Sequence, residues 1–171
     1  MQLLQEALKM KTLFAFIPFL FCLSEALASS VGISPISPDQ KDRIDQEMKK
    51  NVGNPKLLSA VIDATPSIKP FLEMLSCVND YTGTKALNAY ATAGIDLSGP
   101  YVMLRPMRAT TTHNKATCLN VTRIHGWTAP TKNSLKFEVV YTADDSGEVA
   151  KTKHEVIKQP DGSWLFSGEI Y

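Results

Sequence analysis

The chain has 171 residues, of which 44% are hydrophobic and 20% are charged, and its formal net charge is +1. This composition is that of a globular protein and excludes disorder along the whole chain. A total charge so close to zero indicates no particular class of partner, so the positions of the charges carry more information than their sum.

The first 28 residues have the order of a secretory signal peptide. Lys9 and Lys11 precede an apolar run over residues 13–23, which is too short to span a bilayer as a helix. The small-residue site Ala26-Leu27-Ala28 follows, and we expect cleavage after Ala28. Met10 is an alternative start. The predicted mature protein lies outside the cytoplasm, in the periplasm or the medium, without a transmembrane segment.

Residues 29–53 are predicted to form an N-terminal arm and a surface helix. Ser37 is a suitable helix cap, and a highly charged stretch follows over residues 39–50. Ile44 and Met48 are the only apolar residues of that stretch and lie four positions apart, which gives one narrow apolar stripe. We therefore expect this helix to lie on the surface or to dock on a partner.

Helical spacing continues from residue 54 to residue 92. Asn54-Pro55 repeats the pattern of a cap followed by proline, and Thr65-Pro66 is predicted to start another helix. Pro70 is expected to kink that helix or to move its start. A further short helix is predicted over residues 84–92. The segments between residues 54 and 92 could also form two helices in place of three.

After Gly99-Pro100 the pattern changes from helical spacing to alternation. A bulge is expected near Thr122, because the apolar residues around it do not share one strict alternation. Residues 54–171 are thus predicted to form a single α+β domain, with N-terminal helices packed on a curved antiparallel meander of four to five strands. The predicted strands are Tyr101–Arg105, Lys115–Trp127, Leu135–Tyr141, Val149–Lys158 and Trp164–Ile170.

The chain contains three cysteines, and Cys22 lies in the predicted signal peptide. Cys77 and Cys118 remain in an oxidising compartment, where a disulfide between them is the expected state. On the chain-entropy model such a bond stabilises the fold by roughly 3–4 kcal/mol. It would pin the end of a predicted helix to the first long strand.

Charge is distributed unevenly along the second half of the chain. Residues 98–137 contain six basic side chains and no acid, whereas residues 138–171 contain seven acids and three lysines. Two interpretations are open: the basic stretch forms an anion-binding face, or the two stretches pair across neighbouring strands and neutralise each other.

A candidate binding surface combines arginines in the loop around Pro106 with a strand that carries a cation, an imidazole and an aromatic ring. Arginine offers fork-shaped donors to carboxylates, and tryptophan is a frequent anchor of interfaces. The alternative is an ordinary solvated strand. The candidate residues are Arg105, Arg108, Arg123, His125 and Trp127.

Catalytic and metal signatures are weak. The three histidines, His113, His125 and His154, form no close ligand pair of the kind that zinc sites use, and no Gly-x-Ser-x-Gly elbow occurs. We therefore expect neither metal nor cofactor. An acid–base site could still combine a carboxylate with a tyrosine. The residues considered for it are Asp63, Asp96 and Glu138 with Tyr90 or Tyr101.

The order of helices followed by a long meander, ending in Gly162-Ser163-Trp164-Leu165-Phe166, resembles the cystatin-like or NTF2-like α+β group. The resemblance extends over residues 54–171 as an order of elements. It implies a cone in which a curved sheet and helices enclose a pocket. Some members of that group are isomerases of small molecules, and many are non-catalytic binding modules.

The sequence favours a secreted or periplasmic, non-enzymatic protein that binds another macromolecule. Another secreted or envelope protein is the expected partner, with an acidic protein or an anionic envelope polymer as the natural counterpart of the basic stretch, and nucleic acid is not expected. An inhibitor, a toxin-neutralising protein or an accessory subunit of a secretion machine would each fit. The alternative is a small-ligand pocket protein or an isomerase-like enzyme on the same fold.

Overall fold

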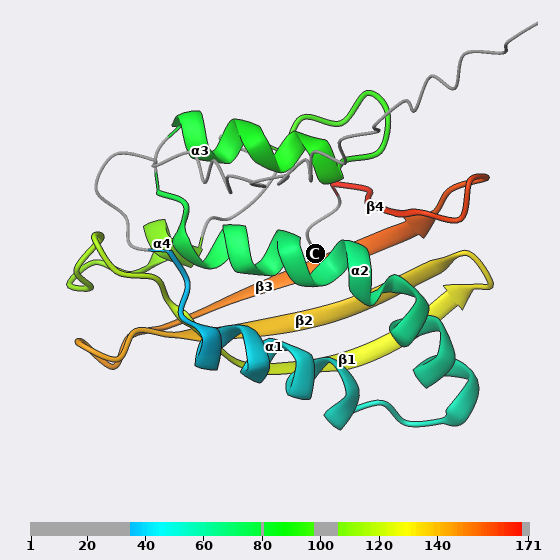
Figure 1. The fold of residues 1–171 in the computed structure, drawn as a ribbon, viewed down its shortest axis with the longest axis horizontal. Helices are drawn as coiled ribbons and strands as arrows, with labels where there is room; N and C mark the ends of the chain where they lie inside the picture. Colours follow the sequence, from blue (N-terminus) through cyan, green and yellow to red (C-terminus); the bar gives the residue numbers. More distant parts are fainter. Residues whose placement is uncertain (1–34, 80, 98–105, 169–171) are drawn as a thin grey trace, which may run out of the picture.

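A computed structural model describes residues 35–79, 81–97 and 106–168 (Figure 1). The predicted signal peptide and the strand predicted at residues 101–105 lie outside these ranges. The described chain is α+β, with helices followed by an open antiparallel sheet, as predicted. The elements are α1 (Pro38–Lys50), α2 (Pro55–Cys77), α3 (Tyr81–Ala86), η1 (Leu87–Tyr90), α4 (Pro106–Ala109), β1 (Asn120–Thr131), β2 (Ser134–Thr142), β3 (Val149–Lys158) and β4 (Trp164–Phe166).

The four strands form a meander in the order β1-β2-β3-β4. The alternation predicted for β2 is confirmed, since Phe137, Val139 and Tyr141 are buried on the face that meets the helices. The bulge predicted near Thr122 is also confirmed. Val121 pairs with Tyr141 while Arg123 pairs with the adjacent Val140, which leaves Thr122 as the extra residue.

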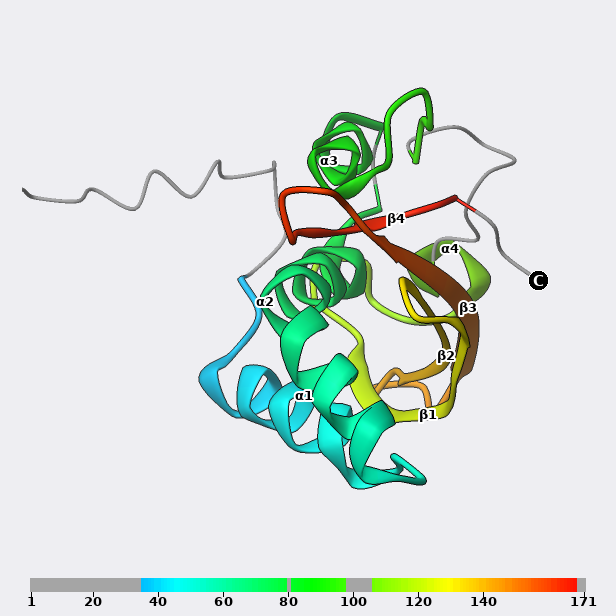
Figure 2. The ribbon, with the colours of Figure 1, turned by 90° about the vertical axis from the view of Figure 1, so that its right-hand side faces the viewer.

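Helix α1 packs on β1 and α2 (Figure 2). Ser37 and Gln40 form a full capping box at its start. The narrow apolar stripe of the helix is completely buried, because Ile44 and Met48 both lie in the common core. At the other end, Asn51 donates a hydrogen bond to the carbonyl of Ile124 at 2.9 Å. The stripe therefore docks within the same chain.

Helix α2 is continuous from Pro55 to Cys77, so the restart predicted at Thr65-Pro66 is wrong. Pro66 and Pro70 each remove one i→i−4 hydrogen bond, but a continuous buried face holds the helix together around them. Figure 1 shows α2 bending along its length, as expected for a helix with internal prolines. Tertiary packing here outweighs the local preference of proline.

The short elements after α2 differ from the predicted helix at residues 84–92. The chain forms α3 and then a 3₁₀ turn, η1, which ends at Tyr90. Ala91 and Thr92 instead reach the sheet: Ala91 bridges Phe166, and the amide of Thr92 donates to the carbonyl of Phe166 at 2.9 Å. Pairing with β4 thus ends the helix earlier than predicted.

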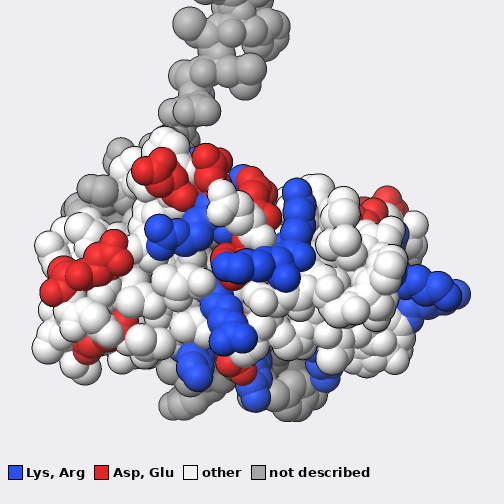
Figure 3. Space-filling model, turned by 90° about the horizontal axis from the view of Figure 1, so that it is seen from below, with Lys and Arg blue, Asp and Glu red and all other residues white. Residues whose placement is uncertain are grey.

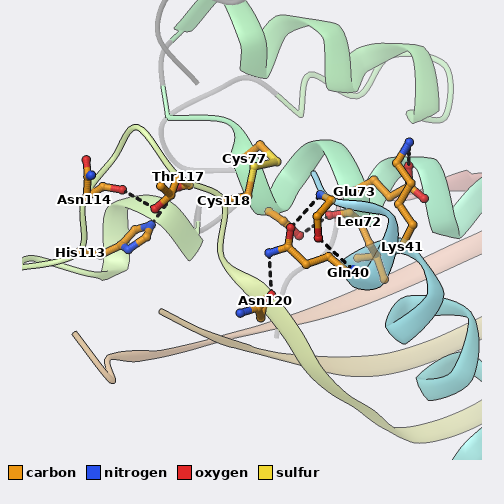
Figure 4. Close-up of a disulfide and its surroundings, with 12 residues drawn as sticks. Gln40, Lys41, Leu72, Glu73, Cys77, His113, Asn114, Thr117, Cys118 and Asn120 are labelled. Carbon is orange, nitrogen blue, oxygen red and sulfur yellow. Dashed lines mark hydrogen bonds and ion pairs between the residues drawn. A yellow bond between two sulfur atoms is a disulfide. The ribbon is translucent and has the colours of Figure 1, made fainter. Parts of the chain in front are cut away.

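The disulfide between Cys77 and Cys118 is present, as predicted (Figure 4). It joins the last residue of α2 to the segment that leads into β1. The amide of Leu119 also donates to the carbonyl of Ser76 at 2.9 Å. Covalent and backbone links therefore fix the same junction between the helical layer and the sheet.

Candidate functional site

The structure separates the predicted site residues. Arg105 lies outside the described residues. Arg108 is exposed on α4, which packs against α2 and β3. Arg123 and His125 lie on β1, on the face of the sheet that points away from α2; we call this the outer face. The loop arginine and the strand residues thus belong to different parts of the surface.

Trp127 does not share a face with Arg123 and His125, so the prediction of a common face is wrong for this residue. A second bulge sets Gly126 and Trp127 opposite the single residue Phe137. Gly126 adopts a φ of 68°, a left-handed conformation that suits glycine. The bulge turns Trp127 inward, where it is 6% exposed and stacks on Phe137 with ring centroids 4.5 Å apart. It is a core residue.

The register of the sheet arranges charged side chains on the outer face in rows across three strands. Directly opposite side chains in an antiparallel pair lie about 4.5–5.5 Å apart at Cβ. The rows are Arg123–Val140–Lys151, His125–Glu138–Lys153 and Thr128–Lys136–Glu155. We call the charged residues of these rows the outer-face patch: Arg123, His125, Lys136, Glu138, Lys151, Lys153 and Glu155.

The patch has more bases than its acids can neutralise. His125 Nε2 lies 3.2 Å from Glu138 Oε1, and Lys136 Nζ lies 3.9 Å from Glu155 Oε2. Arg123, Lys151 and Lys153 are exposed, and within the described ranges none of the three has an ion-pair partner. Cross-strand neutralisation is therefore real but incomplete. Seen from below, the surface carries Lys and Arg side chains across its middle, with Asp and Glu side chains among and above them (Figure 3).

Sequence reasoning missed Lys151 and Lys153 because they belong to the stretch with net negative charge. Their signal is the alternation of β3, in which Lys151 and Lys153 are exposed while Thr152 and His154 are buried. The strand register then sets Lys151 opposite Val140 and Lys153 opposite Glu138, on the same face as the basic residues of β1 and β2. The outer face thus gathers cations from stretches of opposite local charge.

A hollow of about 290 Å³ opens in the outer face beside the second bulge. Gly126 contributes no side chain there, and a Cβ at this position would meet no atom within 4 Å. The charged residues around the hollow are His125, Lys136, Glu138 and Lys153. Such a hollow can receive one side chain of a binding partner. Lys153, which has no ion-pair partner in the described chain, lies there beside the paired groups His125–Glu138 and Lys136–Glu155.

The carboxylates considered for acid–base chemistry have other partners than a tyrosine in the described part of the chain. Asp63 accepts hydrogen bonds from Lys158 and from the indole of Trp164, which hold the pKa of its carboxyl below its usual value. Asp96 is exposed and bonded to Asn88, whereas Tyr90 packs edge-on against Phe71, 5.8 Å away. Glu138 lies on the outer face, and Tyr101 falls outside the described residues.

His154 is a buried member of the aromatic core. Its ring lies within 6 Å of the rings of Phe71, Phe137 and Phe166, and its Nε2 is 2.6 Å from the hydroxyl of Thr152. Burial lowers the pKa of His154 to about 3, so the ring is neutral at physiological pH. Among the described residues, no three His, Cys, Asp or Glu side chains gather as a metal site would require.

No helix in the described ranges is both long enough and apolar enough to cross a membrane. Comparison of the chain with protein-family models, with curated proteins and with solved structures found no match.

Proposed function

We propose that this protein is a secreted or periplasmic, non-enzymatic binding protein that engages an acidic macromolecule through the outer-face patch. The observation that carries the proposal is the row Arg123–Val140–Lys151, in which two exposed cations flank an apolar side chain and meet no acid in the described chain. The hydrogen-bonded register fixes the backbone positions from which both cations project, so a partner meets them at a defined spacing along the sheet.

The hollow beside Gly126 supports the same proposal. A carboxylate of the partner that enters it meets Lys153, which has no ion-pair partner in the described chain and lies in the row next to Arg123 and Lys151. A hollow with charged groups and Phe137 in its lining can hold one inserted side chain of a partner with complementary charge. An acidic protein of the same compartment is therefore the partner we propose.

The compartment rests on two features. A signal peptide over residues 1–28 is predicted from the sequence, and the disulfide between Cys77 and Cys118 fits an oxidising environment. Non-catalytic proteins in that setting inhibit extracytoplasmic enzymes, neutralise toxins or act as accessory subunits of secretion machines. The resemblance to binding modules of the cystatin-like or NTF2-like group is compatible with each of them.

The test is capture with the mature protein, residues 29–171, as bait in an extract of secreted and envelope proteins. The partner identified by wild type is then purified, and its affinity is measured for the Arg123→Glu/Lys151→Glu variant. We expect at least a tenfold loss of affinity, and we expect wild-type affinity to fall as salt rises. A Lys49→Glu/Lys85→Glu variant, which reverses two exposed lysines on helices, is the matched control.

An Arg105→Glu/Arg108→Glu variant tests the loop arginines that the sequence indicated. Affinity lost in this variant and kept in the Arg123→Glu/Lys151→Glu variant would move the site away from the outer face. Equal affinity in all variants, or the absence of any captured protein, would contradict the proposal.

A further inference from the structure

A groove of about 650 Å³ lies between the first turns of α2 and the end of the hairpin formed by β1 and β2. Its volume is in the range of small-molecule sites, which is about 300–1,000 Å³. The lining residues are Asn54, Lys56, Leu57, Ala60, Trp127, Thr128, Ala129, Thr131, Lys132, Ser134, Leu135 and Trp164. Both tryptophans of the chain are thus part of this groove.

The two indole groups of the groove differ in one respect. Trp164 Nε1 donates a hydrogen bond to Asp63 Oδ2 at 2.9 Å. The side chain of Trp127 is only 6% exposed, and its Nε1 is buried without an acceptor within the described chain. A buried donor without a partner is rare in folded proteins because it costs free energy. The atom has almost no accessible surface, so an oxygen atom of a bound molecule reaches it only when the side chains around it move.

The charges of the groove have one sign. Lys56 and Lys132 are exposed on its two sides, and no lining residue is an acid. Within the described ranges neither lysine has an ion-pair partner. Asp63, which holds the indole of Trp164, is itself paired with Lys158 at 2.7 Å, so its charge is already balanced. The groove therefore combines an apolar floor with two available cations.

We infer that this groove binds a small anionic amphiphile, a molecule with an aliphatic or aromatic body and one carboxylate. The body packs against Leu57, Leu135 and the ring of Trp127. The carboxylate pairs with Lys56 and Lys132, and one of its two oxygens accepts the indole hydrogen of Trp127 once the side chains that cover this donor have moved. This site lies apart from the outer-face patch and uses none of its residues.

Decanoate is a suitable probe, and the two tryptophans report its binding directly. We expect a saturable change in tryptophan fluorescence with decanoate, and at least tenfold weaker binding of decanol and of decyltrimethylammonium, which share its chain but lack its charge. In ¹⁵N-labelled protein, the indole N–H signal of Trp127 should shift on binding. The signal of Trp164, already bonded to Asp63, should move less.

Variants distinguish the contribution of the two lysines to decanoate binding from that of the indole donor. Lys56→Glu/Lys132→Glu should weaken decanoate binding at least tenfold, whereas Lys49→Glu/Lys85→Glu should leave it unchanged. Trp127→Phe keeps a ring against Phe137 but removes the donor, and it should also weaken binding. Equal affinity for the three probes, no saturable signal, or wild-type affinity in Lys56→Glu/Lys132→Glu would each overturn the inference. Arg123→Glu/Lys151→Glu should bind decanoate normally, so the two proposed sites can fail separately.

Discussion

His113 Nδ1 lies 2.7 Å from the carboxylate oxygen Oδ1 of Asp145, although the two residues are 32 positions apart in the sequence. The other ring nitrogen, Nε2, lies 3.0 Å from the carbonyl oxygen of Thr117, a pure acceptor. In the same turn, Glu148 accepts from the amides of residues 111, 112 and 113. The turn between β2 and β3 thus holds the segment that leads to Cys118, some residues of which Figure 4 shows.

We predict that Glu148 contributes most of the stability of the contact between the β2–β3 turn and residues 111–113. Bonds from the amide and hydroxyl of Thr111 and from its neighbours lower the pKa of Glu148 well below its usual range. We expect Glu148→Gln to lower the melting temperature at pH 7 clearly more than Asp144→Asn, which removes an exposed charge from the same turn. Thermal unfolding followed by circular dichroism checks this. Equal effects of the two variants would show that the contact contributes no stability.

The disulfide is predicted to be complete and stabilising in the mature protein. Because Cys77 and Cys118 are bonded across a sequence separation of 41, native protein should show no reactive thiol before reduction. Cys77→Ser/Cys118→Ser should lose roughly 3–4 kcal/mol of unfolding free energy on the chain-entropy model. Urea unfolding with and without dithiothreitol measures this. Reductant should destabilise wild type alone, and two thiols titrating in the native protein would disprove the prediction.

The sequence predicts best where one rule governs a segment. The alternation over residues 135–141 predicts β2 because nothing interrupts it, and the two mature cysteines leave only one pairing. Prediction from the sequence fails where tertiary packing determines the local structure. Pro66 does not end α2, because buried residues on both sides hold one helix, and the bulge at Gly126 turns Trp127 inward. A single glycine thus removes the predicted aromatic anchor from the candidate site.

The pairing register of the strands also explains why the sequence does not predict Lys151 and Lys153 as members of the outer-face patch. A strand pattern shows which residues share a face, but it does not show which residue of the next strand lies opposite. The pairs Val140–Lys151 and Glu138–Lys153 follow from the hairpin register. Only with that register in place do the charges of β1 and β3 belong to one surface.

Helix α1 is predicted to be an integral part of the domain. Met48 is fully buried between α1 and its neighbours, so Met48→Ala removes packed atoms and should cost about 2–5 kcal/mol. Lys49→Ala, one position later on the exposed side, should change the unfolding free energy by less than about 0.5 kcal/mol. Chemical denaturation of both variants makes the comparison. A small effect at Met48 would instead support a peripheral helix ahead of a domain that begins at residue 54.

His154 is predicted to make the protein less stable as the pH falls below neutrality. The ring has a pKa of about 3 in the folded protein and near 6.5 when unfolded, so between these values only the unfolded chain binds the proton. Unfolding free energy should therefore fall by about 1.4 kcal/mol for each pH unit below 6.5 from this group alone. His154→Phe removes the group but keeps an aromatic ring beside Phe71 and Phe166.

The informative quantity is the difference in unfolding free energy between wild type and His154→Phe, measured by urea denaturation at pH 7 and at pH 5. Whatever the packing cost of the substitution, that cost is the same at both pH values and cancels. The difference should move by about 2 kcal/mol in favour of the variant at pH 5, because wild type alone loses stability through this ring. A constant difference would mean that the ring binds its proton equally well in both states. Burial would then not control its protonation.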